Sequence, residues 1–288
     1  MLFTLVRHGE STANIQQLWS GHTNHPLTSL GLRQAELLAQ RFENVKFSEI
    51  YSSDLQRARN TAESILNRNR YRSSTPHIIT DPRIREQNFG ELEGSPWRIW
   101  HLKKLWNRTE PFPGGESAEQ LLKRATEVLD EILEKFLYRE KDNTKNDTVD
   151  NNEDESHVLI ASHGLWITEF LRAISLRARI TTKHGHLSNT SVTIVRVAPR
   201  PRAGADALIQ QNPLSVFFIC INDTSHLDEE TTRVKKDKKE EGMMESVKNS
   251  TILKYFTRES DRPIAAATTI AGAINRPNVE NGVKENED

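Results

Sequence analysis

The chain has 288 residues and a formal net charge of −1 at pH 7, so its composition indicates no general attraction to nucleic acid or to a membrane surface. It contains no apolar stretch of membrane-spanning length, and its one cysteine, Cys220, excludes an internal disulfide. Cys220 lies in an apolar run and is expected to be a small core residue. Because the N-terminal apolar segment is short and lacks a basic start, we expect a cytoplasmic protein without a signal peptide.

The first predicted element is a buried strand over residues 1–6, which are apolar and β-prone apart from Thr4. It ends at Arg7-His8-Gly9, where a cation, an imidazole and a glycine come together. Ligands bind at the carboxyl ends of strands in open α/β sheets, so this point is a candidate ligand site. An ordinary turn is the competing interpretation, because short motifs often occur by chance.

A helix is predicted over 31–42, with Thr28 as its expected N-terminal cap and Leu30 close to its apolar face. A short strand over 49–53 follows, and then a second helix over 55–66.

This second helix is expected to take Ser53 or Asp54 as its cap. Arg57 lies in its first turn, where the helix N-terminus attracts anions. Arg59, two positions later, points elsewhere and is expected to lie on the surface.

The middle of the chain carries a short predicted strand over 77–80 and then the run 85–94, which mixes carboxylates with glycines. Because it has no clean period, this run favours a plain connection over a site-forming loop. Tryptophans and leucines over 97–106 predict an amphipathic helix, and apolar spacing predicts a long helix from 117 to about 138. The polar residues 140–156 are expected to form a disordered loop.

Residues 157–162 predict another apolar strand, which also ends in a histidine and a glycine, His163-Gly164, before a helix. Two parallel strands with this ending place His8 and His163 at the same edge of the sheet. Packing alone does not explain the repetition, because a glycine after a buried strand requires no histidine before it. The second copy therefore favours a shared site over two ordinary turns.

Residues 191–197 and 214–221 are β-rich and predict a late hairpin at a sheet edge. We therefore expect one domain over 1–227 and a charged, mostly disordered tail over 228–288. The basic run Lys235–Lys239 leaves a nuclear location as an alternative to the cytoplasm. Its acidic neighbours favour a solvated segment, so neither nucleic-acid nor membrane binding is expected.

His184 and His186 stand close together in the sequence, as some metal ligands do. No cysteine or carboxylate neighbours them, so a polar loop is favoured. We expect neither a metal nor another cofactor.

Five side chains suit phosphoryl transfer without a metal ion, namely Arg7, His8, Arg57, Glu86 and His163. His8 as a neutral imidazole can attack phosphorus and form a phosphohistidine. Arg7 and Arg57 can bind the phosphate oxygens and neutralise their charge. A protonated His163 adds a further donor. Glu86 can protonate the leaving oxygen and later accept a proton from water.

These residues lie in ordered sequence blocks at 5–14, 51–62, 85–94, 113–117 and 162–164. The blocks resemble the signature of the histidine phosphatase superfamily, in its phosphoglycerate-mutase-like branch. The resemblance implies an α/β fold with three α/β/α layers around a mostly parallel, mixed sheet, and a catalytic domain over 1–227. It also implies a phosphohistidine on His8, phosphate binding by Arg7, Arg57 and His163, and proton donation by Glu86. The residues expected near the substrate are Asn14, Ser20, Gly21 and Gly164.

Within this family, phosphoglycerate mutases carry an adjacent arginine pair after the acid/base glutamate, and residues 96–113 contain none. The closing blocks 188–192 and 221–227 look like those of fungal broad-specificity phosphatases. We therefore expect a metal-independent phosphatase that hydrolyses phosphomonoesters of small metabolites. A sugar-bisphosphate phosphatase and a cofactor-dependent phosphoglycerate mutase stay open as alternatives. An inactive phospho-ligand or protein-binding module is a different class, and it has no need for all five reactive side chains. The sequence does not indicate an oligomeric state.

Overall fold

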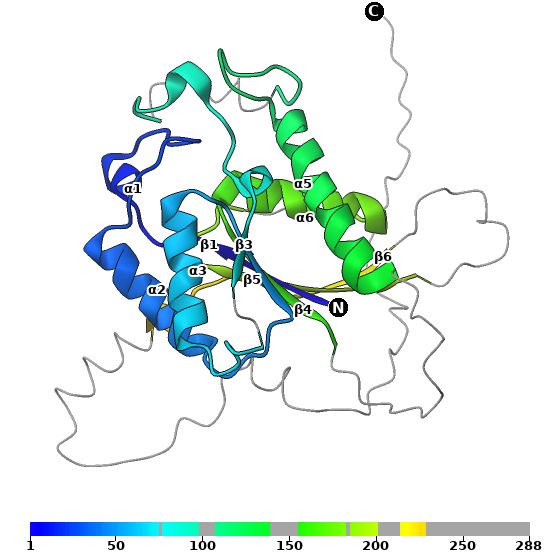
Figure 1. Ribbon diagram of the computed structural model, residues 1–288. Coiled ribbons are helices and arrows are strands. Elements are labelled where there is room, and N and C mark those ends of the chain that lie inside the picture. The colour runs from blue at the N-terminus through cyan, green and yellow to red at the C-terminus, as the bar shows by residue number, and fades with distance from the viewer. Residues whose placement is uncertain (75–76, 98–106, 139–154, 183–184, 201–213, 229–288) are drawn as a thin grey trace, which may run out of the picture. The chain divides into compact units, whose positions relative to one another are not determined.

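The computed structural model describes residues 1–74, 77–97, 107–138, 155–182, 185–200 and 214–228 (Figure 1). These residues contain a six-stranded sheet with the order β3-β2-β4-β1-β5-β6. The strands are β1 (Leu2–Arg7), β2 (Glu49–Ser52), β3 (Ile78–Thr80), β4 (His157–Ser162), β5 (Val192–Pro199) and β6 (Leu214–Asp223). The β3-β2-β4-β1 pairs are parallel, whereas β5 is antiparallel to both β1 and β6. The predicted mixed, mostly parallel sheet and the antiparallel pair at its edge are confirmed.

Helices connect the strands and cover both faces of the sheet. They are α1 (Thr12–Gln16), α2 (Ser29–Arg41), α3 (Gln56–Arg68), α5 (Ala118–Leu133) and α6 (Gly164–Ala178). Two 3₁₀ turns lie at Pro82–Ile84 and Gly90–Leu92, and α5 continues into a π-helical turn over Glu134–Tyr138. None of the described helices is long and apolar enough to cross a membrane.

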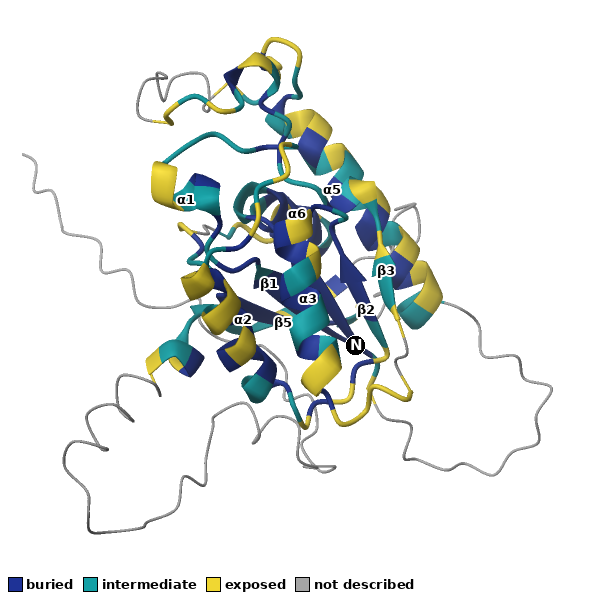
Figure 2. Ribbon diagram, turned by 60° about the vertical axis from the view of Figure 1, so that its left-hand side comes forward, coloured by how far each residue is buried: buried dark blue, intermediate teal, exposed yellow. Residues whose placement is uncertain are grey.

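The main hydrophobic core lies between one sheet face and the α5–α6 pair (Figure 1). Phe3 projects from β1 onto Phe170 of α6, with ring centroids 5.4 Å apart in an edge-on arrangement. The opposite face lies on the side of α2 and α3, where Thr4 contacts the buried His157 at 2.7 Å. Figure 2 shows the central strands buried and β3 more exposed, as its edge position requires. The three α/β/α layers expected from the sequence are therefore present.

The parallel strands bring three chain segments to one edge of the sheet. Arg7 at the end of β1 is in register with Ser162 at the end of β4, and Ser52 of β2 is in register with Ala161. The next residue of each strand is thus His8, His163 and Ser53. The expected meeting of both histidines at one edge is confirmed, and a serine joins them.

Two local predictions on the helices are wrong. The residue before α3 is Leu55, so neither Ser53 nor Asp54 caps this helix. The Asp54 carboxylate instead accepts two hydrogen bonds from Arg85 at 2.7 and 2.6 Å, and the N–H of Gln56, the first residue of α3, donates to the side-chain oxygen of Asn24 at 2.8 Å. Leu30 is 54% exposed, so it does not belong to the buried face of α2. The Thr28 cap is confirmed, since its hydroxyl oxygen accepts the Gly31 N–H at 2.9 Å.

Cys220 lies on β6 and is half-buried rather than a core residue, because β6 is the last strand of the sheet. Burial raises the pKa of its thiol. Several predictions concern residues outside the described ranges, so they stay predictions. These are the helix over 98–106, the loop over 140–154, the histidine at 184 and the tail from 229 onward.

Candidate active site

His8 leaves the end of β1 as a buried, neutral imidazole that is 4% exposed. Its Nδ1 lies 2.6 Å from the carbonyl oxygen of Gly9, and only a protonated ring nitrogen can donate to that oxygen. Nε2 therefore carries the lone pair. Burial, followed by the charges of Arg57 and Arg7, lowers the pKa of His8 well below its ordinary value, which keeps the ring unprotonated at neutral pH.

The backbone around His8 is tightly held. A Cβ on Gly9 would lie 2.5 Å from the carbonyl oxygen of Gly31 in α2, so only glycine permits this approach. The carbonyl oxygen of His8 accepts hydrogen bonds from the Asn189 side chain at 3.0 Å and from the Thr190 N–H at 3.2 Å. The ring thus leaves a loop that is fixed from both sides.

Arg57 is fully buried in the first turn of α3. Its two terminal nitrogens donate to the carbonyl oxygens of Thr23 and Gly21, each at 2.8 Å, and its Nε donates to Nδ1 of His163 at 3.2 Å. Burial lowers the pKa of Arg57 to about 10, so the side chain is still a cation at neutral pH. Gly21, with φ of +33°, presents the carbonyl that anchors this cation.

His163 is fully buried and is bonded at both ring nitrogens. Because Nδ1 accepts from Arg57, the ring proton lies on Nε2, which is 2.9 Å from the Ser53 hydroxyl. Burial and then the Arg57 charge lower the pKa of His163 well below its ordinary value. In this structure His163 is a neutral support for Arg57, and its ring centroid lies 5.1 Å from that of His8.

Arg7 enters the site from the end of β1 and donates through Nη1 to the carbonyl oxygen of Leu187. Its Nε is buried and has no hydrogen-bond partner among the described residues. Burial lowers the pKa of Arg7, and the Glu86 carboxylate opposes that shift. The unpartnered N–H makes Arg7 a ready donor to an anion beside His8.

Glu86 presents its carboxylate to the N-terminus of α6. One carboxylate oxygen accepts the N–H groups of Gln87 at 2.9 Å and Trp166 at 3.1 Å, and the other accepts that of Leu165 at 3.2 Å. Gly164 leaves room beside it, since a Cβ there would lie 3.8 Å from both Arg7 Nε and Glu86 Oε2. The carboxylate and the free N–H of Arg7 therefore face the same small space.

A cavity of about 640 Å³ opens over these groups. Every predicted site residue lines it except Gly21 and His163, which lie behind Arg57. Asn14 contributes an oriented amide, because its oxygen accepts hydrogen bonds from Ser11 N–H at 3.0 Å and from Asn189 at 3.2 Å. The amide nitrogen of Asn14 is therefore the atom of this side chain that can donate to a ligand.

Sequence reasoning missed part of the cavity wall. The unpredicted lining residues include Gln17, Trp19, Phe89, Trp97, Leu165, Thr168, His186, Leu187 and Asn189. The run 85–94 forms part of the site rather than a plain connection, because Glu86 and Phe89 line the cavity. No spacing signal in 185–189 pointed to the site, since this loop reaches it only through the pairing of β5 with β1. In the described residues no group of histidine, cysteine and carboxylate side chains could hold a metal ion.

Comparison with known proteins gives a consistent set of matches. Residues 3–203 match the model of the histidine phosphatase superfamily (branch 1). The Yersinia pestis protein named "Probable phosphoglycerate mutase GpmB" is 39% identical over 142 residues, which is 45% of this chain and 62% of that protein. The chain thus spans about three fifths of the length of the curated relatives it matches.

Two solved structures share the fold. A mycobacterial glucosyl-3-phosphoglycerate phosphatase is 19% identical, with a TM-score of 0.58, over 77% of this chain and 98% of its own. The α-ribazole phosphatase from Shigella flexneri is 20% identical, with a TM-score of 0.55, over 78% of this chain and 97% of its own.

Proposed function

Because the chain belongs to the histidine phosphatase superfamily (branch 1), we propose that it is a metal-independent phosphatase that hydrolyses phosphomonoesters of small metabolites through a phosphohistidine on His8. The observation that carries the proposal is the fixed tautomer of His8, with Nδ1 donating to Gly9 and Nε2 unprotonated between two arginines. A neutral imidazole with a defined lone pair is a competent nucleophile.

In the first step the phosphate group binds beside His8, where Arg7 offers its free Nε–H and Arg57 offers the N–H groups that its carbonyl partners leave unused. These two cations neutralise charge on the phosphoryl oxygens, a role that metal ions fill in other phosphoryl-transfer sites. The His8 Nε2–phosphorus bond forms as the ester P–O bond breaks. Protonated Glu86 gives its proton to the leaving oxygen, which departs as an alcohol.

In the second step water attacks phosphorus, and ionised Glu86 accepts the proton that the water loses. The phosphorus–nitrogen bond breaks, inorganic phosphate is released, and His8 returns to its neutral form. His163 holds the Arg57 guanidinium in place, because its unprotonated Nδ1 accepts the Arg57 Nε–H. The neutral His163 thus supports the transition state through the cation that it orients.

The cavity supports a substrate larger than phosphate itself. Its wall beyond the arginines includes Trp19, Phe89, Trp97 and Leu165, so the alcohol part of the ester lies against apolar surface. Trp97 is 47% exposed at this wall. We therefore place esters with an apolar or aromatic alcohol among the good substrates.

The test is hydrolysis of p-nitrophenyl phosphate and a panel of sugar, glycerate and other alkyl phosphates in EDTA. Wild type, His8→Ala and the matched control His77→Ala are compared, since His77 is exposed and does not line the cavity. We expect activity in EDTA that survives in the control and is lost in His8→Ala, together with an acid-labile phosphoenzyme.

Other outcomes select the alternatives. Strong preference for sugar bisphosphates identifies the sugar-bisphosphate phosphatase. Phosphate exchange between bisphosphoglycerate and monophosphoglycerate without hydrolysis identifies the mutase, the activity after which the Yersinia relative is named. A folded wild type that neither turns over nor labels is the inactive binding module.

A further inference from the structure

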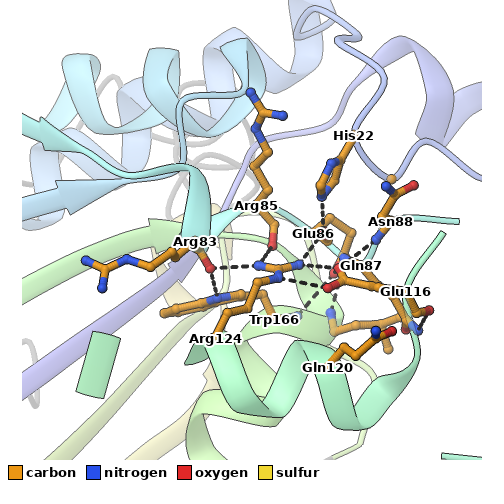
Figure 3. Close-up of polar contacts among 12 residues, drawn as sticks. His22, Arg83, Arg85, Glu86, Gln87, Asn88, Glu116, Gln120, Arg124 and Trp166 are labelled. Carbon is orange, nitrogen blue, oxygen red and sulfur yellow. Dashed lines mark hydrogen bonds and ion pairs between the residues drawn. The ribbon is translucent and has the colours of Figure 1, made fainter. Parts of the chain in front are cut away.

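Arg124 of α5 uses its whole guanidinium group on the segment that carries Glu86 (Figure 3). Nη1 donates to the carbonyl oxygens of Arg83 at 2.7 Å and Arg85 at 2.5 Å. Nη2 donates to the Glu86 carbonyl at 2.7 Å and to the Glu116 carboxylate at 2.5 Å, and Nε donates to the same carboxylate at 3.0 Å. All five N–H donors of Arg124 are therefore engaged, three of them with backbone carbonyls next to Glu86.

Glu116 fixes the other side of the same segment. Its carboxylate accepts the Asn88 N–H at 2.8 Å, and its own backbone exchanges hydrogen bonds with Asn88 and Gln87. Both side chains of this ion pair are mostly buried, each with 15% of its surface exposed. We call Arg124 and Glu116 the 124–116 clamp. It joins α5 to residues 83–88 from both directions.

Glu86 is thus held twice, by two different helices. Its backbone carbonyl accepts from Arg124 and, at 3.1 Å, from His22 Nε2, whereas its carboxylate rests on the first N–H groups of α6. Trp166 of α6 also donates from its indole to the Arg83 carbonyl at 2.7 Å. The clamp therefore sets the main chain from which the acid/base side chain reaches the cavity (Figure 3).

We propose that Arg124 and Glu116 are positioning residues that set the reach of Glu86 for proton transfer; the inference rests on the proposed phosphatase activity. Neither side chain lines the cavity. A lysine at 124 has only three donors on one nitrogen and cannot span three carbonyls and a carboxylate. Loosening the clamp moves Glu86 by a fraction of an ångström, and proton transfer is sensitive to displacements of that size.

A purely structural role predicts a different pattern from a positioning role. An alkyl phosphate expels a strongly basic alkoxide and depends on the proton from Glu86. p-Nitrophenyl phosphate expels a stable phenolate and depends on it far less. Loss of positioning therefore lowers kcat/KM selectively for the alkyl ester, whereas partial unfolding lowers both by the same factor.

The experiment measures kcat/KM for p-nitrophenyl phosphate and for the fastest alkyl phosphate of the panel. The variants are Arg124→Lys and Glu116→Gln. The control is Arg108→Lys, because Arg108 forms an equally close pair with the mostly buried Glu169, at 2.9 and 2.6 Å, and does not contact residues 83–88. Thermal unfolding of each protein is recorded alongside.

We expect the alkyl-to-aryl ratio of kcat/KM to fall about tenfold or more in Arg124→Lys and Glu116→Gln, with the control within about twofold of wild type. An unchanged ratio in Glu116→Gln, which keeps the side-chain shape, would overturn the inference even if Arg124→Lys does not fold. A wild type that hydrolyses neither ester overturns the proposed function itself, so the two failures are distinguishable.

Discussion

His8 and His163 occupy equivalent places at the ends of the neighbouring parallel strands β1 and β4, yet their rings are used differently. His8 lines the cavity, binds its own loop through one nitrogen and leaves the other free. His163 is sealed from the cavity, with one nitrogen bonded to Arg57 and the other to Ser53. The same local pattern of strand, histidine, glycine and helix thus yields the proposed nucleophile in one copy and a support for Arg57 in the other. What surrounds each ring, rather than the motif, decides its role.

The strongest test of this difference is phosphoenzyme formation. In His8→Ala no phosphoenzyme forms, and turnover falls by roughly 10⁴-fold or more, because the nucleophile is gone. In His163→Ala, turnover falls by roughly 10²–10³-fold, since transition-state stabilisation is weakened, but the phosphoenzyme still forms. Rapid-quench labelling with a phosphorylated substrate checks both. A labelled His8→Ala protein would show that the two roles are assigned the wrong way round.

Replacing the glycine after each histidine is expected to affect mainly stability in one case and mainly activity in the other. Gly9→Ala forces a methyl against the Gly31 carbonyl and is expected to destabilise the fold by about 1–3 kcal/mol or more. Gly164→Ala meets only ordinary contacts, so its stability stays within about 1 kcal/mol of wild type. Its methyl lies beside Arg7 and Glu86, and kcat/KM falls about tenfold. Urea unfolding and steady-state kinetics distinguish the two, and equal destabilisation would contradict the steric argument.

Acid sensitivity is expected from both rings, because burial lowers both pKa values. Below about pH 6.5 the unfolded chain binds protons that the native rings do not, so folding stability falls as the pH falls. Each histidine contributes up to about 1.4 kcal/mol per pH unit in that range. Unfolding free energies at pH 7, 6 and 5 are compared for wild type, His8→Asn and His163→Asn. We expect a shallower slope in both variants and no change in His77→Ala.

The smallest effect on activity is expected when only the hydrogen-bond partner of His163 is replaced. Ser53→Ala removes the partner of His163 Nε2 and leaves that buried N–H unsatisfied, which costs about 1–3 kcal/mol of stability. Arg57 is held less firmly, so KM for the phosphate ester rises about threefold to tenfold, while phosphohistidine formation persists. An activity as low as that of His8→Ala would place Ser53 in the chemistry instead.

The sequence predicted the repeated part of the site and most of the elements that present it. Both histidines follow apolar strands, and Arg57 lies in the first turn of a helix, so local patterns place all three. The Thr28 cap was predicted in the same way, because Thr28 stands just before a segment whose apolar residues recur with helical spacing. These features depend on residues close together in the chain.

Features that depend on distant partners were not predicted. Asp54 looked like a helix cap, but it pairs with Arg85, 31 residues later. Leu187 and Asn189 reach the cavity through strand pairing that no local pattern reveals. The sequence did not point to Arg124 at all, although this side chain binds three backbone carbonyls of the segment that carries Glu86. Hydrogen bonds between residues far apart in the chain determine the role of each of these residues, and such bonds cannot be inferred from residue spacing.

The pairing of β1 with β4 also governs when the protein acquires its chemistry during synthesis. Leu2 pairs with His157, about 150 residues later, so the first strand leaves the ribosome long before its parallel neighbour exists. At about 5–20 residues per second, roughly 8–30 seconds separate the two. During that interval the apolar β1 residues have no sheet to join, which makes chaperone protection of the nascent chain useful. His8, the proposed nucleophile, is therefore made before the β4 strand that lies beside it in the finished site.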